Sequence, residues 1–346
     1  VDPEQIKQIK HQQEYKNLLP QLKELQAARG KSLLADSETA TSNFTELYKQ
    51  APIVKPQNEA VSRTKQLLDR LAPERYVKRE WNIPRPTRDQ IRQQLENDAL
   101  EKYPGLFKKK QRAAYVESSA QPAFEEAIAN WENQRQLFEK QEYEIEQREN
   151  ALFAEKYEEK RAALEHSLSD DEDVIIDAVE GWLSTLQLPL EMDAAIEIDG
   201  GVLYLDLDLP EVEDLPTEYV QILKSGKPSI KNKTQKQLKQ EYAQCVFGLA
   251  EFLATSIFNL SCMLNHIAIS GYTQRRNKNG DIDDDYIFSV VFFRDQFTNE
   301  QISDPVQIFK LFPNRMKLST ANTFSKITPF TEDEVLAVIE SQTHIS

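Results

Sequence analysis

Hydrophobic residues follow two different periods along the chain, and the change between them divides it. Up to about residue 168, apolar residues recur at a spacing of three or four among charged residues, which is typical of helices. From about residue 194, apolar and polar residues alternate in several stretches, which is typical of half-buried strands. The sequence therefore predicts an α+β protein in which an N-terminal long-helix, coiled-coil-like arm precedes a compact domain.

The longest helical pattern begins at Pro122 and runs to residue 168 without a glycine or a second proline. One large apolar residue recurs every seven positions on it, giving an interaction stripe of Phe124, Trp131, Phe138, Ile145 and Leu152. A coiled-coil seam has two apolar positions per heptad, so this stripe is thin. We expect an antiparallel contact with the earlier helices to cover it, while an intermolecular coiled coil and a lone exposed helix stay open.

The compact domain is expected to begin at a capping box formed by Ser169 and Glu172. A hairpin around Gly200, a buried helix over about 233–264 and two later strands predict the order α-β-β-(β)-α-β-β-α. The expected organisation is therefore a basic bundle of short helices (1–121), a long acidic helix (122–168), the α+β domain (169–316), and a C-terminal extension with a short helix (317–346). Within the first part, Gly30 is expected to end a helix.

Charge is distributed unevenly within a chain whose formal net charge is −15. Residues 1–120 hold 22 Lys and Arg against 16 Asp and Glu, whereas residues 121–230 hold 8 against 28. The second section repels nucleic acids and anionic membranes. We therefore expect no membrane partner, and a nucleic-acid partner only through the N-terminal third.

Asp206 and Asp208 alternate with leucines on a predicted strand and are the candidate catalytic residues. Two such carboxylates suit a metal-dependent nuclease or phosphoesterase, but the interpretation we favour is the solvent face of a half-buried edge strand. The sequence has two cysteines and four scattered histidines, so we expect no metal site and no cofactor. The same cysteine usage suits a reducing compartment.

Basic residues in the N-terminal third are interleaved with aromatic residues, as in proteins that bind single-stranded nucleic acids. The candidates are Arg75, Lys78, Arg79, Lys108, Lys109, Lys110 and Arg112. The alternative, which we favour, is that these cations pair with the acidic section folding back on them.

Residues of the last predicted strands and helix resemble a known group. The runs Ile269–Gln274, Tyr286–Phe297 and Asp304–Arg315 are similar to the C-terminal domain of uncharacterised bacterial proteins with variable N-terminal parts. The resemblance covers about residues 170–316 and implies a bacterial cytoplasmic protein, from genome regions in which phage-defence systems are common. Ser289 and Arg294 match the pattern, and the group carries no assigned catalytic residues.

Together these features favour a non-enzymatic protein–protein interaction or assembly module of a bacterial multi-component system. A protein partner is expected, and a homodimer stays open. The alternatives are a divergent nuclease that uses Asp206 and Asp208, and nucleic-acid binding through the basic residues. A leader or an upstream domain before Val1 also stays open.

Overall fold

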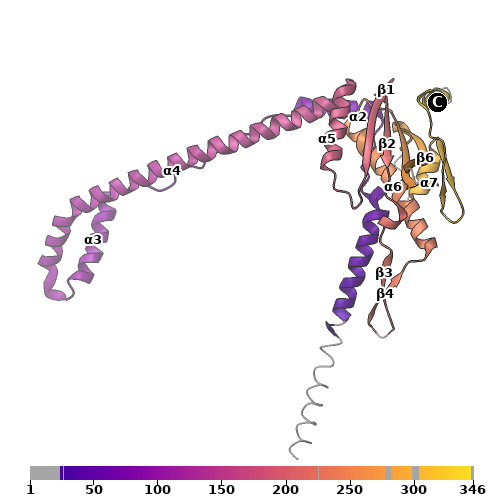
Figure 1. Ribbon diagram of the computed structural model, residues 1–346. Helices are drawn as coiled ribbons and strands as arrows, with labels where there is room; N and C mark the ends of the chain where they lie inside the picture. The colour runs from indigo at the N-terminus through magenta and orange to yellow at the C-terminus, as the bar shows by residue number, and fades with distance from the viewer. Residues whose placement is uncertain (1–23, 26, 225, 277–281, 298–303, 344–346) are drawn as a thin grey trace, which may run out of the picture. The chain divides into compact units, whose positions relative to one another are not determined.

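The computed structural model describes residues 24–25, 27–224, 226–276, 282–297 and 304–343. The chain forms two compact units: a sheet unit, made of the residues up to 69 and from 163 onward, and a helical unit of residues 70–162. Figure 1 shows the long helix α4 (Lys109–Ser167) and the sheet that follows it in the chain. The predicted α+β class with a long helix before a sheet is confirmed.

The helical unit contains an extended strap (residues 71–87), α3 (Arg88–Lys102), the 3₁₀ turn η2 (Leu106–Lys108) and most of α4. Thr87 caps α3 because its hydroxyl accepts a hydrogen bond from the Gln90 amide, and the Gln90 side chain bonds back to Thr87. Leu95 and Ala99 of α3 are buried with Val116 of α4. This small core joins α3 and the first turns of α4 into a helical hairpin.

The expectation that the long helix begins at Pro122 is wrong, because α4 begins at Lys109 and continues through Pro122. Proline costs a helix one backbone hydrogen bond and crowds the preceding turn, so it favours a first-turn position. The helix nevertheless continues on both sides of Pro122. There, Val116 is part of the hairpin core, and Tyr115, Ala120 and Ala123 pack against that core. Tertiary packing therefore outweighs the local preference.

The sheet unit is built around one mixed sheet. A helix over residues 27–45 precedes its labelled elements. These are η1 (Leu47–Gln50), α2 (Gln57–Arg70), α5 (Glu172–Thr185), β1 (Asp193–Asp199), β2 (Val202–Asp208), η3 (Val212–Asp214), β3 (Glu218–Ile222), β4 (Pro228–Asn232), α6 (Gln235–Leu260), β5 (His266–Arg276), β6 (Ile282–Phe293), η4 (Arg294–Gln296), α7 (Pro305–Leu311), β7 (Asn314–Leu318), β8 (Phe324–Ser325) and α8 (Glu332–Thr343).

The strand order of the main sheet is β1-β2-β5-β6-β7-β8. The β1–β2 hairpin turns at Gly200 and Gly201, whose positive φ angles of 57° and 78° suit a two-residue hairpin loop and favour glycine. β2 and β5 pair in parallel, with α6 in the connection between them, and β6 and β7 follow in antiparallel order. The predicted hairpin and central helix are thus present.

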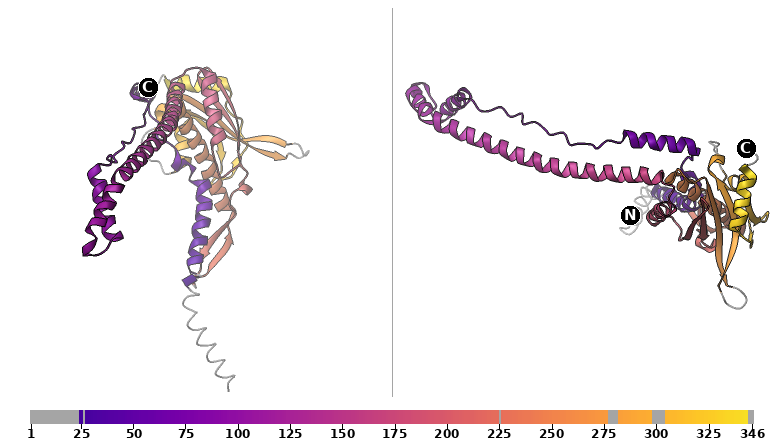
Figure 2. Two further views of the ribbon diagram at one scale, coloured as in Figure 1. Left: turned by 90° about the vertical axis from the view of Figure 1, so that its left-hand side faces the viewer. Right: turned by 90° about the horizontal axis from the view of Figure 1, so that it is seen from above.

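Helix α6 lies against the inner face of the sheet and supplies most of the core. Leu203, Leu205 and Leu207 of β2 are at most 1% exposed, and Phe247 of α6 packs against Phe288 of β6. The opposite, outer face is approached by the segment before α8, where the Phe330 amide donates to the Ser289 hydroxyl. Figure 2 shows α8, in yellow, on the other side of the sheet from α6.

Among the described helices, α6 alone is long and apolar enough to cross a membrane by length and composition. Its most apolar stretch is 83% buried within the sheet unit. We therefore interpret α6 as the buried core helix of the sheet unit.

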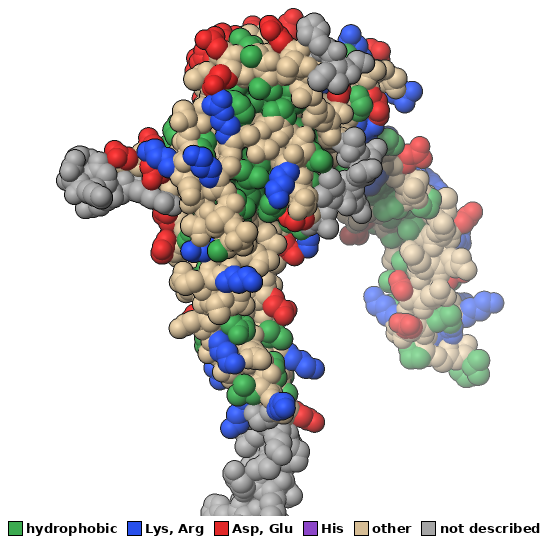
Figure 3. Space-filling view, turned by 90° about the vertical axis from the view of Figure 1, so that its right-hand side faces the viewer, with side chains coloured by type: hydrophobic (Ala, Val, Ile, Leu, Met, Phe, Trp, Pro, Cys, Tyr) green, Lys and Arg blue, Asp and Glu red, His purple; other side chains and the backbone are tan. Residues whose placement is uncertain are grey.

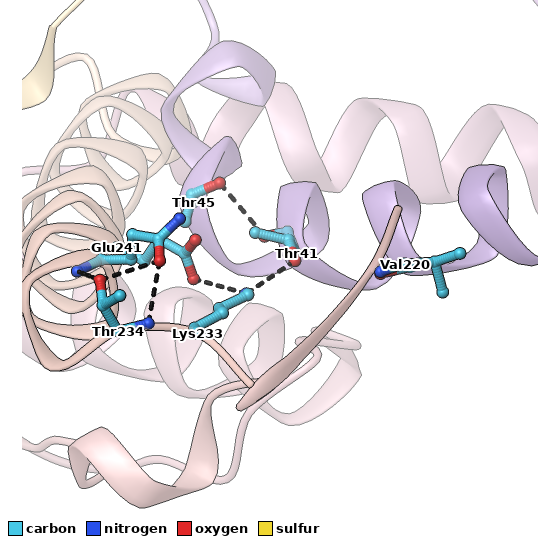
Figure 4. Close-up of polar contacts among 8 residues, drawn as sticks. Thr41, Thr45, Val220, Lys233, Thr234 and Glu241 are labelled. Atoms are coloured by element: carbon cyan, nitrogen blue, oxygen red, sulfur yellow. Dashed lines mark hydrogen bonds and ion pairs between the residues drawn. The ribbon is translucent and has the colours of Figure 1, made fainter. Parts of the chain in front are cut away.

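A second, two-stranded sheet is formed by β3 and β4. The sequence predicts only one optional strand here, because β4 lies in a lysine-rich stretch. Lys233, just after β4, is almost completely buried; its Nζ lies 2.6 Å from Glu241 of α6 and 2.9 Å from the Thr41 hydroxyl of the helix over 27–45 (Figure 4). The Val220 amide donates to Ser37 of the same helix. These bonds fasten the helix over 27–45 to the small sheet.

Three further expectations need correction. Gly30 lies inside a helix, where a β-carbon would meet Ile222 at 3.3 Å, so close packing and not helix termination accounts for the glycine. The N-cap of α5 is Asp171, which accepts from the Asp173 amide, and Ser169 instead bonds to Asp171. The C-terminal extension contains the expected short helix, α8, but it also contributes the end of β7 and the whole of β8 to the main sheet.

Candidate functional site

The middle of the interaction stripe of α4, Trp131 and Phe138, contacts the chain's own strap. The strap runs antiparallel to α4, and Figure 2 shows the two side by side. Trp81 packs on Phe138 with ring centroids 5.2 Å apart, and the Trp131 indole donates to the Ile83 carbonyl at 2.9 Å. An extended strap can follow a one-residue-per-heptad stripe, whereas a second helix needs a wider apolar face.

The two ends of the stripe are covered differently. The Arg88 guanidinium, at the start of α3, lies 5.2 Å from the centre of the Phe124 ring. Ile145 is half-buried, and Leu152 is 42% exposed. The expected antiparallel cover is therefore present, but its main part is an extended segment and not a helix, and a coiled coil is not confirmed.

Glu142 of α4 is the polar anchor of the strap. Its carboxylate accepts hydrogen bonds from the Arg79 side chain at 2.7 Å, from the Arg79 amide at 3.1 Å and from the Tyr76 hydroxyl at 3.2 Å. The Glu142 side chain is 5% exposed. The Arg79 guanidinium holds the pKa of Glu142 below its ordinary value of 4.5, and the backbone amide and Tyr76 act in the same direction. The strap is therefore fixed to α4 by a carboxylate that must stay ionised.

The predicted basic residues fall into two groups in the structure. In the strap, Lys78 pairs with Glu146 at 2.9 Å and Arg79 with Glu142, as the fold-back interpretation expects. Arg75 of the strap is exposed. The second group, Lys108, Lys109, Lys110 and Arg112, lies at the turn of the α3–α4 hairpin.

This turn, residues 102–116, is called the tip. Lys108, Lys109 and Lys110 of the tip are exposed, and the ion pairs found among the described residues include none of them. Arg112 donates to the Gly105 carbonyl at 2.6 Å and so closes the turn. The structure therefore does not bring the two groups of basic residues together.

Two large apolar side chains are also displayed at the tip. Leu106 is 92% exposed and Phe107 is 100% exposed. The preceding Gly105 has a φ of 109°, a conformation that favours glycine and places η2 at the end of the turn. Next to them, the first turn of α4 has no acidic residue, so the positive end of its helix dipole adds to the lysines. The tip thus combines an apolar pair with concentrated positive charge.

The candidate catalytic residues Asp206 and Asp208 lie on the outer face of β2, as alternation predicts. Asp206 is half-buried and accepts a hydrogen bond from the Tyr286 hydroxyl at 2.6 Å. Burial raises the pKa of Asp206, and Tyr286 partly opposes that rise. Burial, and then the neighbouring Asp193, raise the pKa of Asp208. Asp284 is a further acid that raises the pKa of both residues, so the described charged neighbours that act on the pair are acidic.

A cavity of about 490 Å³ opens beside Asp206 on this face. Its floor includes the Ser270 and Ser289 hydroxyls, 3.0 Å apart, and its rim includes Glu332 at the start of α8. Figure 3 views the sheet unit from the side of α8, and acidic side chains gather along the upper edge of this face. Within the described ranges, no three His, Cys, Asp or Glu side chains are arranged to hold a metal ion.

The two residues of the family resemblance take part in packing. Arg294 is 2% exposed and donates to the carbonyls of Leu264, at 2.7 Å, and of Phe258 and Ser261 at the end of α6. A cation at a helix C-terminus is favourable, so Arg294 caps α6. Ser289 joins β6 to β5 and to the segment before α8.

The sequence identifies Tyr76 only as an aromatic residue among the basic ones, and it does not single out Glu142 and Tyr286. A signal for the contact of Tyr76 and Glu142 exists in the basic run Tyr76–Arg79 and the acidic run Glu142–Glu146, whose charges match when the chain folds back. Tyr286 gave no such signal, because its contact with Asp206 depends on strand register.

Comparison of the chain with protein-family models, with curated proteins and with solved structures found no match. The resemblance to a bacterial C-terminal domain therefore rests on the quoted residues alone.

Proposed function

We propose that this chain is a non-enzymatic interaction module, in which the helical unit acts as a stiff spacer with an attachment point at its tip. The sheet unit would dock on another protein of the same assembly. A cytoplasmic bacterial setting, and a role in a multi-component system such as phage defence, belong to the same proposal.

The observation that carries the proposal is the difference between the flank and the tip of the helical unit. Along the flank, the strap occupies the stripe and pairs with acids of α4, so a partner there would have to displace Trp81 and Arg79. At the tip, Leu106 and Phe107 are exposed beside Lys108–Lys110, which take part in none of the ion pairs between described residues. Exposed apolar residues that are clustered rather than scattered commonly mark interaction surfaces. The geometry thus favours attachment at the tip.

Strap and helix also support the role of spacer. An isolated helix with one apolar residue per heptad gains little from packing, and its stability depends on local propensity. The strap adds apolar contacts at Trp81 and charged hydrogen bonds at Glu142 along the same helix. A helix held in this way resists bending without needing a second chain.

The test uses the full chain with an affinity tag, expressed in its native cell, and a lysate cleared of membranes. We expect a defined protein to be retained and the purified complex to exceed the monomer mass in light scattering. A strict monomer that retains no partner would contradict the proposal. Asp206→Asn combined with Asp208→Asn is the matched variant for the nuclease alternative, and the complex should survive it, whereas magnesium-dependent cleavage abolished by it would favour that alternative.

A further inference from the structure

The tip differs in charge from the rest of the helical unit. Residues 70–162 hold 18 Lys and Arg and 18 Asp and Glu, whereas residues 102–116 hold five cations and no acid. Lys102 lies over the Tyr115 ring, 4.6 Å from its centre, so this cation is directed by an aromatic side chain and not by a carboxylate. The surface at the tip is therefore strongly positive.

Leu106 and Phe107 are adjacent residues at the end of a turn, and both side chains are almost fully solvated. Their solvation is unfavourable in water, and a turn that begins at Gly105 presents both together. Lysines follow them directly, at positions 108, 109 and 110. Two exposed apolar side chains are therefore followed directly along the chain by three positive charges.

We propose that the tip binds the surface of an anionic lipid bilayer, with Leu106 and Phe107 inserted between headgroups and Lys108–Lys110 next to lipid phosphates. This inference rests on the proposed role of the tip as an attachment point. Apolar insertion and a polybasic patch are the two signals that reversible membrane attachment combines. The mechanism involves no membrane-spanning segment.

Single-stranded nucleic acid fits the same charge less well. A nucleic-acid site would bind the backbone through cations and stack bases on exposed aromatic rings, and neither interaction involves a fully exposed leucine. Of the aromatic residues at the tip, Tyr103 and Tyr115 already pack against each other with ring centroids 6.0 Å apart. Phe107 alone is left to stack on bases. Leu106 therefore favours lipid over nucleic acid.

The net negative charge of the chain would oppose binding of the tip to an anionic membrane only if the acidic residues acted at the tip. Salt screens exposed charges beyond about 8 Å at physiological ionic strength. Two acids of α4, Glu142 and Glu146, form ion pairs with the strap cations Arg79 and Lys78. The local charge at the tip, and not the total of −15, should govern its contact with a surface.

The experiment is co-sedimentation of the full chain with vesicles in about 0.1 M salt. One set contains phosphatidylcholine with phosphatidylglycerol, in a ratio of about 2:1, and the other contains phosphatidylcholine alone. We expect binding to the first set only. Replacing both Leu106→Ser and Phe107→Ser should weaken it about 100-fold, since each side chain contributes roughly tenfold.

Charge reversal at the three lysines, Lys108→Glu, Lys109→Glu and Lys110→Glu, should weaken binding by a similar factor or more, since each lysine contributes about fivefold. These changes place acids at the start of α4, where the helix dipole favours them, so folding is retained. The matched control is Leu137→Ser with Tyr143→Ser, which replaces exposed apolar residues on the flank of α4 and should leave binding unchanged.

Two outcomes would overturn the lipid assignment. One is the absence of binding to anionic vesicles, or binding that the double serine variant does not weaken. The other is tight binding of labelled single-stranded DNA that depends on the lysines but not on Leu106. A protein complex recovered from the membrane-free lysate would still support the proposed function in either case, so the two failures are distinguishable.

Discussion

Glu251 lies in the middle of α6, and its carboxyl group is buried. Its Oε2 atom has no hydrogen-bond partner among the described residues. The residue is 8% exposed, and burial raises the pKa of Glu251 from 4.5 to about 8. No charged neighbour contributes to this change. The folded protein therefore holds the Glu251 proton at neutral pH, whereas the unfolded chain releases it.

The sign of the pH dependence follows from this difference. The folded state binds the proton more tightly, so the free energy of unfolding falls as the pH rises from 4.5 to about 8. The whole interval corresponds to roughly 5 kcal/mol. About 2 kcal/mol of this loss develops between pH 6 and pH 8. Glu251→Gln keeps the shape and cannot ionise, so the variant should gain about 2 kcal/mol over the wild type between those two pH values.

Urea denaturation at pH 6 and pH 8 measures this gain. Trp182 is the tryptophan of the sheet unit, where it packs against Phe252, so both proteins carry Trp81→Phe and Trp131→Phe to isolate its fluorescence. Glu180→Gln, an exposed position on α5, is the control and should show no such gain. An equal stability difference at both pH values would refute the reasoning, because Glu251 would then be ionised in the folded state.

Three further predictions concern the strap, a glycine and a cap. Glu142→Gln should release the strap and expose Arg79 to trypsin at neutral pH, and equal cleavage of the variant and the wild type would contradict this. Because the pKa of Glu142 is lowered in the folded protein, the wild-type strap should stay attached above pH 4.5 and detach as the pH falls below that value. Gly271→Ala places a methyl group 2.7 Å from Phe288 Cζ and should cost about 1–3 kcal/mol in thermal unfolding, so an unchanged melting temperature would show that the sheet can relax. Arg294→Met removes donors from the carbonyls at the end of α6 and should cost about 3 kcal/mol, of which Arg294→Lys should recover part; no recovery would argue against capping.

The elements of the sheet unit that could be predicted are those with a local signal. The β1–β2 hairpin follows from Gly200 and Gly201 between alternating residues, and α6 follows from an apolar stretch too long for a strand. β4 could not be predicted, because its stability comes from pairing with β3 and from the burial of Lys233 between Thr41 and Glu241. The contact between Lys233 and Thr41 joins residues 192 positions apart, and no local pattern records it.

The outer face of the sheet shows the same limit. Alternation on β2 correctly placed Asp206 away from the leucines, but it could not supply Tyr286. The register of β5 and β6 shifts between Gly271 and Tyr272, so that Tyr286 pairs with Tyr272. Simple alternation from Phe288, a core residue, would put Tyr286 on the inner face. The bulge instead turns it toward Asp206.

The division of charge along the sequence changes its meaning once the two units are known. By sequence thirds, a basic section precedes an acidic one, and the fold-back interpretation pairs the two. By structural unit, the helical unit is neutral in total. The strap brings cations such as Arg79 onto acids of α4, and the five cations of the tip offset the other residues of the unit, which hold 13 Lys and Arg against 18 Asp and Glu. Positive charge within the helical unit is therefore concentrated at the tip, where five cations and no acid accompany an exposed Leu106–Phe107 pair. A partner that recognises the tip by charge should be anionic.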